Sequence, residues 1–243
     1  MSHELALALI FLLSAFTMSF AGFGFALVSV PLLALFLPIK EAVALQFPYC
    51  LGLFMYQAWH YRAHFDWRQM RPLFLGTALG LTLGAYLLYH LPEVTLKRSL
   101  AAFIAAVVAF NALPTSKLFM ARIAQNPWWG RACGFISGSF FGAYTIGGPP
   151  AAVYIMSVTD DPLKAKSFLA SFFTIQFILI GFIYGAAGMF TWPGLKTSLI
   201  YSPVVALGSL AGFWAFGKAS TTLYRQVVAV MLLLAAAMLW WRA

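Results

Sequence analysis

The stretch TIGGPPAAVYIM, residues 145–156, decides how the fold of this chain is interpreted. It lies in a long apolar region, yet it carries two consecutive glycines followed by two consecutive prolines. Glycine weakens a helix interior through its backbone entropy, and proline does so through its missing N–H. A helix is therefore expected to end at this stretch, and a new one is expected to begin within it.

The composition around this stretch is that of a membrane protein. Residues A, V, I, L, M, F, W, Y and C make up 63% of the 243 residues, and only 9% are charged. Uncharged runs such as residues 5–39 and 167–195 are longer than a soluble core helix requires. We expect an all-α polytopic protein, with residues 1–243 forming a single transmembrane domain of about eight full spans plus short broken or re-entrant helices.

The halves of the chain resemble each other at a nearly constant offset of about 123 to 128 residues. GFALVSVP from Gly24 aligns with GGPPAAVY from Gly147, and GLTLGAYL from Gly80 aligns with GSLAGFWA from Gly208. This similarity predicts a duplicated unit, with repeat 1 at residues 1–120 and repeat 2 at residues 121–243. Each repeat is expected to hold five helical segments, at roughly 4–21, 25–37, 40–60, 69–91 and 93–113, and at 131–146, 149–159, 163–187, 194–216 and 220–241.

The positive charges orient these segments. A single helix over residues 5–39 would be about 52 Å long, against a hydrocarbon core of about 30 Å, so the first two segments must turn back or break. If they form a hairpin, ten of the fifteen Lys and Arg residues fall on one face, with both termini outside. A single broken crossing splits the charges almost evenly. The hairpin is therefore favoured, and it makes the two repeats inverted, as in many secondary transporters.

Matched interruptions in two repeats point to a binding site, because discontinuous helices present their N-terminal amides at membrane depth. The alternative is that the glycines are packing positions and the prolines are kinks. Buried amides and hydroxyls nearby are candidates for hydrogen bonds to an anion, or else for bonds between helices. The candidate substrate-binding residues are Gly22, Gly24, Gly147, Gly148, Pro149 and Pro150 at the breaks, with Gln46, Tyr49, Ser171 and Thr174 in the following helices.

These motifs also resemble a known family. GFGFALVSVPLLALFLPIKEAVA and GGPPAAVYIMSVTDDPLKAK are similar to the two signature copies of the sulfite exporter TauE/SafE family, and the resemblance covers nearly the whole chain. It implies a transporter of sulfite, organosulfonates or related anions in a bacterial inner membrane. We expect export by alternating access; an importer of an anion or another small solute on the same fold is the alternative.

Other chemistry is weakly indicated. His60 and His64 have a spacing that could hold a metal, but no third ligand is near in the sequence, so we expect neither a metal nor a cofactor. Cys50 and Cys133 are interpreted as small core residues. The Lys and Arg residues are scattered through loops, which argues against a nucleic-acid partner. An intramembrane enzyme would need a nucleophile with a base, or a metal set, at membrane depth, and a structural subunit would have no use for the paired breaks.

Overall fold

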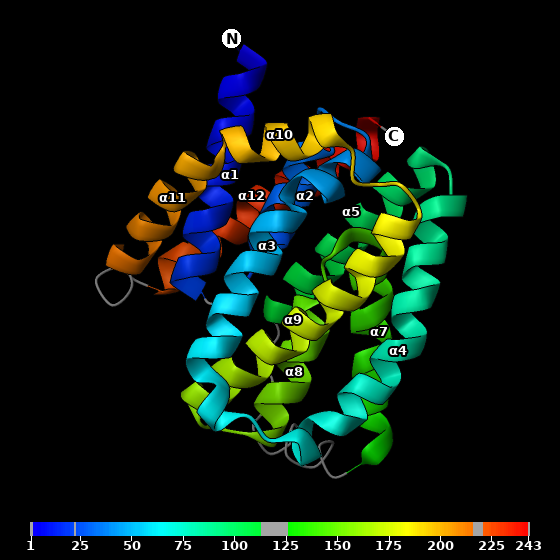
Figure 1. Cartoon of the computed structure of the whole chain (residues 1–243), viewed down its shortest axis with the longest axis vertical. Helices are drawn as coiled ribbons and strands as arrows, with labels where there is room; N and C mark the ends of the chain where they lie inside the picture. Colours follow the sequence, from blue (N-terminus) through cyan, green and yellow to red (C-terminus); the bar gives the residue numbers. More distant parts are fainter. Residues whose placement is uncertain (1, 22, 113–125, 216–220, 243) are drawn as a thin grey trace. The chain divides into compact units, whose positions relative to one another are not determined.

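The computed structural model describes residues 2–21, 23–112, 126–215 and 221–242, and every regular element in them is a helix (Figure 1). The all-α prediction is therefore confirmed. The helices of the first half are α1 (Ser2–Ala21), α2 (Phe25–Leu33), α3 (Ile39–Tyr61), the 3-10 helix η1 (Arg62–His64), α4 (Trp67–His90) and α5 (Glu93–Ala112). Those of the second half are α7 (Pro127–Tyr144), α8 (Gly148–Val158), α9 (Pro162–Ala186), α10 (Trp192–Ile200), α11 (Ser202–Ala215) and α12 (Thr221–Arg242).

One predicted segment, 194–216, was wrong as a single helix. The structure divides it into α10 and α11, which meet at a bend of 45°. Pro203 is the second residue of α11 and has no N–H to donate to the carbonyl of Leu199, so the helical ladder cannot continue through it. The N–H of Tyr201 instead bonds the carbonyl of Ser198 at 3.0 Å, which is a tighter turn than an α-helix makes.

Two helices in the described part of the chain, α4 and α9, are long and apolar enough to cross a membrane, or three spans if the bent pair α10–α11 counts as one. Their outward-facing side chains fit a lipid environment. Leu75, Leu79 and Leu83 follow one another at four-residue spacing along α4 and are all exposed, Leu79 by 70%. The count of about eight full spans stays a prediction.

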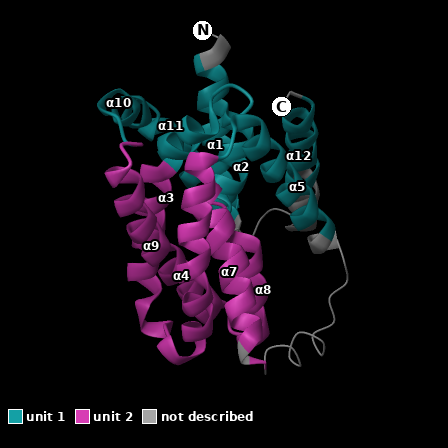
Figure 2. Cartoon of the chain, turned by 90° about the vertical axis from the view of Figure 1, so that its right-hand side faces the viewer, with its two compact units in different colours: residues 1–46, 91–113, 190–243 teal, residues 47–90, 114–189 magenta. Residues whose placement is uncertain are grey.

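The chain divides into two compact units, and neither corresponds to one repeat (Figure 2). Unit 1 comprises residues 1–46, 91–113 and 190–243, and unit 2 comprises residues 47–90 and 114–189. Each unit therefore combines segments from both halves of the sequence. In unit 1 helix α1 packs on α11, and in unit 2 helix α7 packs on α4. The first segment of one predicted repeat thus packs on the fourth segment of the other.

Glycines make both of these helix pairs close. A Cβ atom built on Gly208 of α11 would lie 2.5 Å from the carbonyl oxygen of Leu12 in α1. A Cβ on Gly80 of α4 would likewise lie under 3.0 Å from the carbonyl oxygen of Phe135 in α7. Only glycine permits such backbone approach, which is a common device of membrane helix packing.

The two contacts are equivalent under the sequence alignment. The alignment that pairs Gly80 with Gly208 also pairs Leu12 with Phe135, at the offset of about 123 residues that pairs Gly24 with Gly147. The same glycine contact therefore occurs twice, with the two halves of the chain exchanging roles. This recurrence supports the prediction of a duplicated unit.

Aromatic side chains fill the core of unit 2. Phe141 of α7 lies edge-on to Phe177 of α9, with ring centroids 4.7 Å apart, and Phe54 of α3 lies 5.0 Å from Phe173 of α9. The buried Tyr184 hydroxyl donates to the carbonyl oxygen of Gly142 at 2.8 Å. These contacts hold α3, α7 and α9 together and so fix the position of α7, the helix that precedes the second break.

Candidate functional site

The first break lies in unit 1, between α1 and α2. Gly24 precedes α2 with φ 109° and ψ 4°, a conformation that side-chain-bearing residues rarely adopt. A Cβ at this position would lie 3.2 Å from Thr17 Cγ2 on α1. The turn thus favours glycine at position 24 for two reasons: its positive φ, and the crowding of Thr17 by any Cβ atom there. Gly22, the other candidate of this break, lies outside the described residues.

The second break lies in unit 2, between α7 and α8. Helix α7 ends at Tyr144 and is capped by Thr145, whose left-handed conformation (φ 56°) turns the chain. The N–H of Thr145 donates to the carbonyl of Phe141 at 2.7 Å. Gly147 then precedes α8 and accepts a hydrogen bond from the buried Ser137 hydroxyl at 2.7 Å. A Cβ on Gly147 would lie 2.6 Å from the Ser137 carbonyl oxygen. Ser137, which the sequence did not single out, therefore fixes this break.

The two breaks differ in the hydrogen bonds that they can donate. The first turn of α2 consists of Phe25, Ala26 and Leu27, each of which has a backbone N–H, and no side chain caps it. The first intrahelical bond of α2 runs from the N–H of Val28 to the carbonyl of Gly24, at 3.1 Å. The first turn of α2 therefore contains three backbone N–H donors that precede this bond.

In α8 the corresponding turn begins Gly148–Pro149–Pro150, so only the first of these three residues has an N–H. All three are partly exposed. The two prolines therefore shape the start of α8 rather than bind an anion through amides. The sequence analysis treated the two breaks as equivalent, whereas the first three residues of α2 carry three backbone N–H groups and those of α8 carry one.

The four second-rank candidates have different environments. Gln46 is fully buried, and its Nε2 lies 3.3 Å from the Val43 carbonyl oxygen, while Tyr49, one turn further along α3, is partly buried. Ser171 and Thr174 lie on one face of α9 and are partly buried. The Thr174 hydroxyl donates to the carbonyl of Ala170 at 2.8 Å, so it can offer a ligand only its lone pairs.

Four further polar side chains are buried without a hydrogen-bond partner in the described residues: Gln176, Ser167, Ser29 and Ser209. Gln176 of α9 is 0% exposed, and neither its Oε1 nor its Nε2 makes a hydrogen bond. The hydroxyls of Ser167 in α9 and Ser29 in α2 are also buried and make no hydrogen bond. A buried amide without partners costs free energy, so each such group is a candidate to contact a ligand or water. Only the structure distinguishes Gln176, which is buried without a partner, from Thr174, whose hydroxyl is already hydrogen-bonded.

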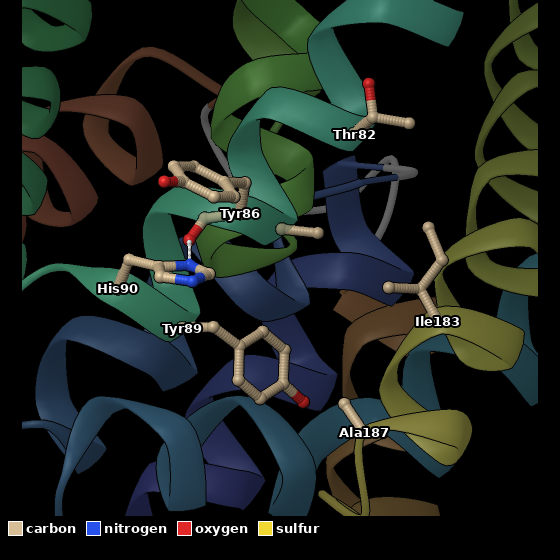
Figure 3. A pocket seen from close by; sticks show the side chains of 7 residues that line it. Thr82, Tyr86, Tyr89, His90, Ile183 and Ala187 are labelled. Carbon is tan, nitrogen blue, oxygen red and sulfur yellow. Dashed lines mark hydrogen bonds between the residues drawn. The ribbon is translucent and has the colours of Figure 1, made fainter.

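A pocket of about 260 Å³ lies in unit 2, between the C-terminal ends of α4 and α9 (Figure 3). Its lining includes Tyr86, Tyr89 and His90 of α4 and Ile183 and Ala187 of α9. His90 Nδ1 lies 2.9 Å from the Tyr86 carbonyl oxygen, and the two rings stack with centroids 4.0 Å apart. None of the candidates from the sequence lines this pocket.

The described residues contain no group of three or more His, Cys, Asp or Glu side chains that could hold a metal ion. His60 stacks edge-on against Tyr61, with centroids 4.8 Å apart, and both it and His64 are exposed. Cys50 and Cys133 are buried, which confirms their interpretation as core residues.

The described residues form only helices, some of them apolar enough to span a membrane. Two helix breaks and close glycine contacts between helices accompany them. These features define the class of polytopic membrane proteins with discontinuous helices. The sequence profile of the sulfite exporter TauE/SafE family matches residues 7–239, nearly the whole chain. The chain therefore belongs to this family. Its members are membrane transporters that export sulfite or related sulfur-containing anions, rather than enzymes. Neither a curated protein nor a solved structure matches the chain.

Proposed function

We propose that this protein is a secondary transporter of the inner membrane that exports sulfite or a small organosulfonate by alternating access. The paired helix breaks carry this proposal, because discontinuous helices at matching points of two repeats typically form transporter binding sites. The break before α2 supplies an uncapped helix start behind Gly24. The break before α8 supplies a start that is fixed by the Ser137–Gly147 hydrogen bond.

The substrate interactions that we propose rest on dipoles rather than charges. A sulfite or sulfonate oxygen would accept hydrogen bonds from the first-turn amides of α2 and gain from the positive end of the helix dipole. Gly148 contributes the corresponding amide at α8. Buried neutral groups, of which Gln176 is the clearest, add donors without placing a charge in the membrane. Gln46, Tyr49, Ser171 and Thr174 stay candidates for the same role.

The proposed alternating access relies on inverted repeats. The repeated glycine contacts, Gly80 with Phe135 and Gly208 with Leu12, support two equivalent halves that exchange segments. The unequal distribution of Lys and Arg supports an odd number of crossings in each half, which would invert the second relative to the first, with both termini outside.

Export in this proposal needs no coupling ion. All six carboxylates of the chain lie at or near segment ends, whereas ion-coupled carriers usually keep one at membrane depth. When an anion leaves a cell with a negative interior, its free energy falls by about 2.3 kcal/mol per charge per 100 mV. Efflux from proteoliposomes should therefore rise with an inside-negative potential. Efflux at full rate without a potential or a concentration gradient would contradict this mechanism.

The break before α8 can be tested with Gly148→Leu. The leucine would cover the amide end of the helix, so we expect transport of labelled sulfite and sulfonates in proteoliposomes to be abolished while the protein still inserts. Gly52→Leu is the matched control, because Gly52 is exposed on α3 and a Cβ built there meets no atom within 4 Å. Transport by Gly148→Leu at the control rate would remove the substrate site from this break.

A further inference from the structure

One end of unit 2 concentrates positive charge. It is formed by the end of α3, by η1 and by the starts of α4, α7 and α9, which lie together at the lower end of Figure 1. Phe65, after η1, lies 5.9 Å from Phe168 of α9, and the Tyr154 hydroxyl of α8 donates to the carbonyl of Gln69 on α4 at 2.6 Å. We call this the basic end. Its cations are Arg62, Arg68, Arg71, Arg131, Lys164 and Lys166.

Four of these cations lie over aromatic rings, among them Lys164, whose Nζ is 5.6 Å from the ring centre of Phe168. The Arg62 guanidinium lies 4.2 Å from the ring centre of Trp59, and that of Arg131 lies 4.8 Å from the ring centre of Trp128. Lys166 lies 5.8 Å from the ring of Tyr61. The two indoles are 69% and 68% exposed. Exposed tryptophans at the ends of membrane helices lie at the level of the lipid headgroups, so the arginines beside them are at that level too.

The acidic residues at this end do not balance the cations. Asp66 and Asp161 each accept a helix-start N–H at 2.9 Å, and Asp66 is also 3.9 Å from Lys164 Nζ. With Asp160 they are three carboxylates against six cations. Arg62, Arg68, Arg71 and Arg131 form no ion pair within the described part of the chain.

We propose that the basic end binds the phosphate groups of anionic phospholipids. Guanidinium groups match phosphate oxygens in geometry. The indole beneath each guanidinium group packs against the adjacent part of the lipid. The arginines stand beside exposed indoles on separate helix ends rather than around a pocket, which favours a lipid layer over one small anion. The pocket of unit 2 lies at the opposite end of α4, beside His90. This proposal does not depend on the transported substrate.

The test is native mass spectrometry of the full-length protein in detergent, titrated with phosphatidylglycerol, with phosphatidylcholine and with inorganic phosphate. We expect phosphatidylglycerol to bind at least tenfold more tightly than phosphatidylcholine. Arg62→Gln combined with Arg131→Gln should weaken phosphatidylglycerol binding by about fivefold per cation removed, and Lys at both positions should retain most of it.

The matched control combines Arg98→Gln and Lys196→Gln. These cations lie 5.7 Å and 5.6 Å from the rings of Trp240 and Trp192, which are also exposed, but they belong to unit 1. The control should bind phosphatidylglycerol like the wild type. The proposal fails if the control loses as much affinity, if both lipids bind equally, or if inorganic phosphate competes as well as the lipid does.

Discussion

Gly147→Ala tests whether the second break must keep its geometry. Gly147 has φ −119°, which alanine adopts without strain, so any cost of this change is steric. The new methyl group would lie 2.6 Å from the Ser137 carbonyl oxygen, 2.8 Å from Ser137 Oγ and 3.1 Å from Phe141 Cβ. The start of α8 must therefore move away from α7, and the Ser137–Gly147 hydrogen bond is lost.

The expected loss of stability follows from these two effects. Overpacking a tight site costs about 1 to 3 kcal/mol, and losing a buried hydrogen bond costs about 1 kcal/mol more. We expect the free energy of unfolding, measured by SDS titration in mixed micelles, to fall by about 2 to 4 kcal/mol. Sulfite transport per folded molecule should fall as well, because the helix start is displaced.

Gly52→Ala is the control for this experiment. A Cβ at Gly52 has open space around it, so alanine should be neutral or stabilising by up to about 1 kcal/mol, with transport unchanged. Adding Ser137→Ala to Gly147→Ala should restore little, because the carbonyl oxygen is still in the way. Wild-type stability and transport in Gly147→Ala would refute the view that this contact positions α8.

Two other substitutions give further tests. Gly24→Ala should destabilise the protein by about 1 to 2 kcal/mol, because φ 109° disfavours any Cβ. Gly24→Asn should cost less, because asparagine tolerates positive φ. Equal free energies of unfolding for the wild type and Gly24→Ala would contradict this reasoning. Gln176→Leu should raise the free energy of unfolding by about 1 kcal/mol or more, since it removes a buried amide without partners, and should reduce sulfite transport if that amide binds the substrate. A drop in stability in Gln176→Leu would mean that the amide has a partner in the folded protein.

Much of the helix layout could be predicted from the sequence because glycine, proline and charge act locally. The helix starts at Phe25 and Gly148 were predicted to within a residue, since a glycine at positive φ and prolines in a first turn both favour the start of a helix. Capping is equally local: Asp161 directly precedes Pro162, and its Oδ1 accepts a hydrogen bond from the N–H of Leu163 at 2.9 Å. The bend at Tyr201 was missed because Pro203 was not weighed as a break.

The sequence by itself determined that the chain is helical, membrane-embedded and interrupted at two matched points. Only the tertiary structure decided which segments pack together, with α1 on α11 and α7 on α4. It alone showed that Ser137 fixes the second break and that Gln176 is buried without a partner. The physical reason is the sequence separation of the interacting residues. Helix breaks depend on neighbours within a few residues, whereas burial and close packing depend on residues far apart in the chain.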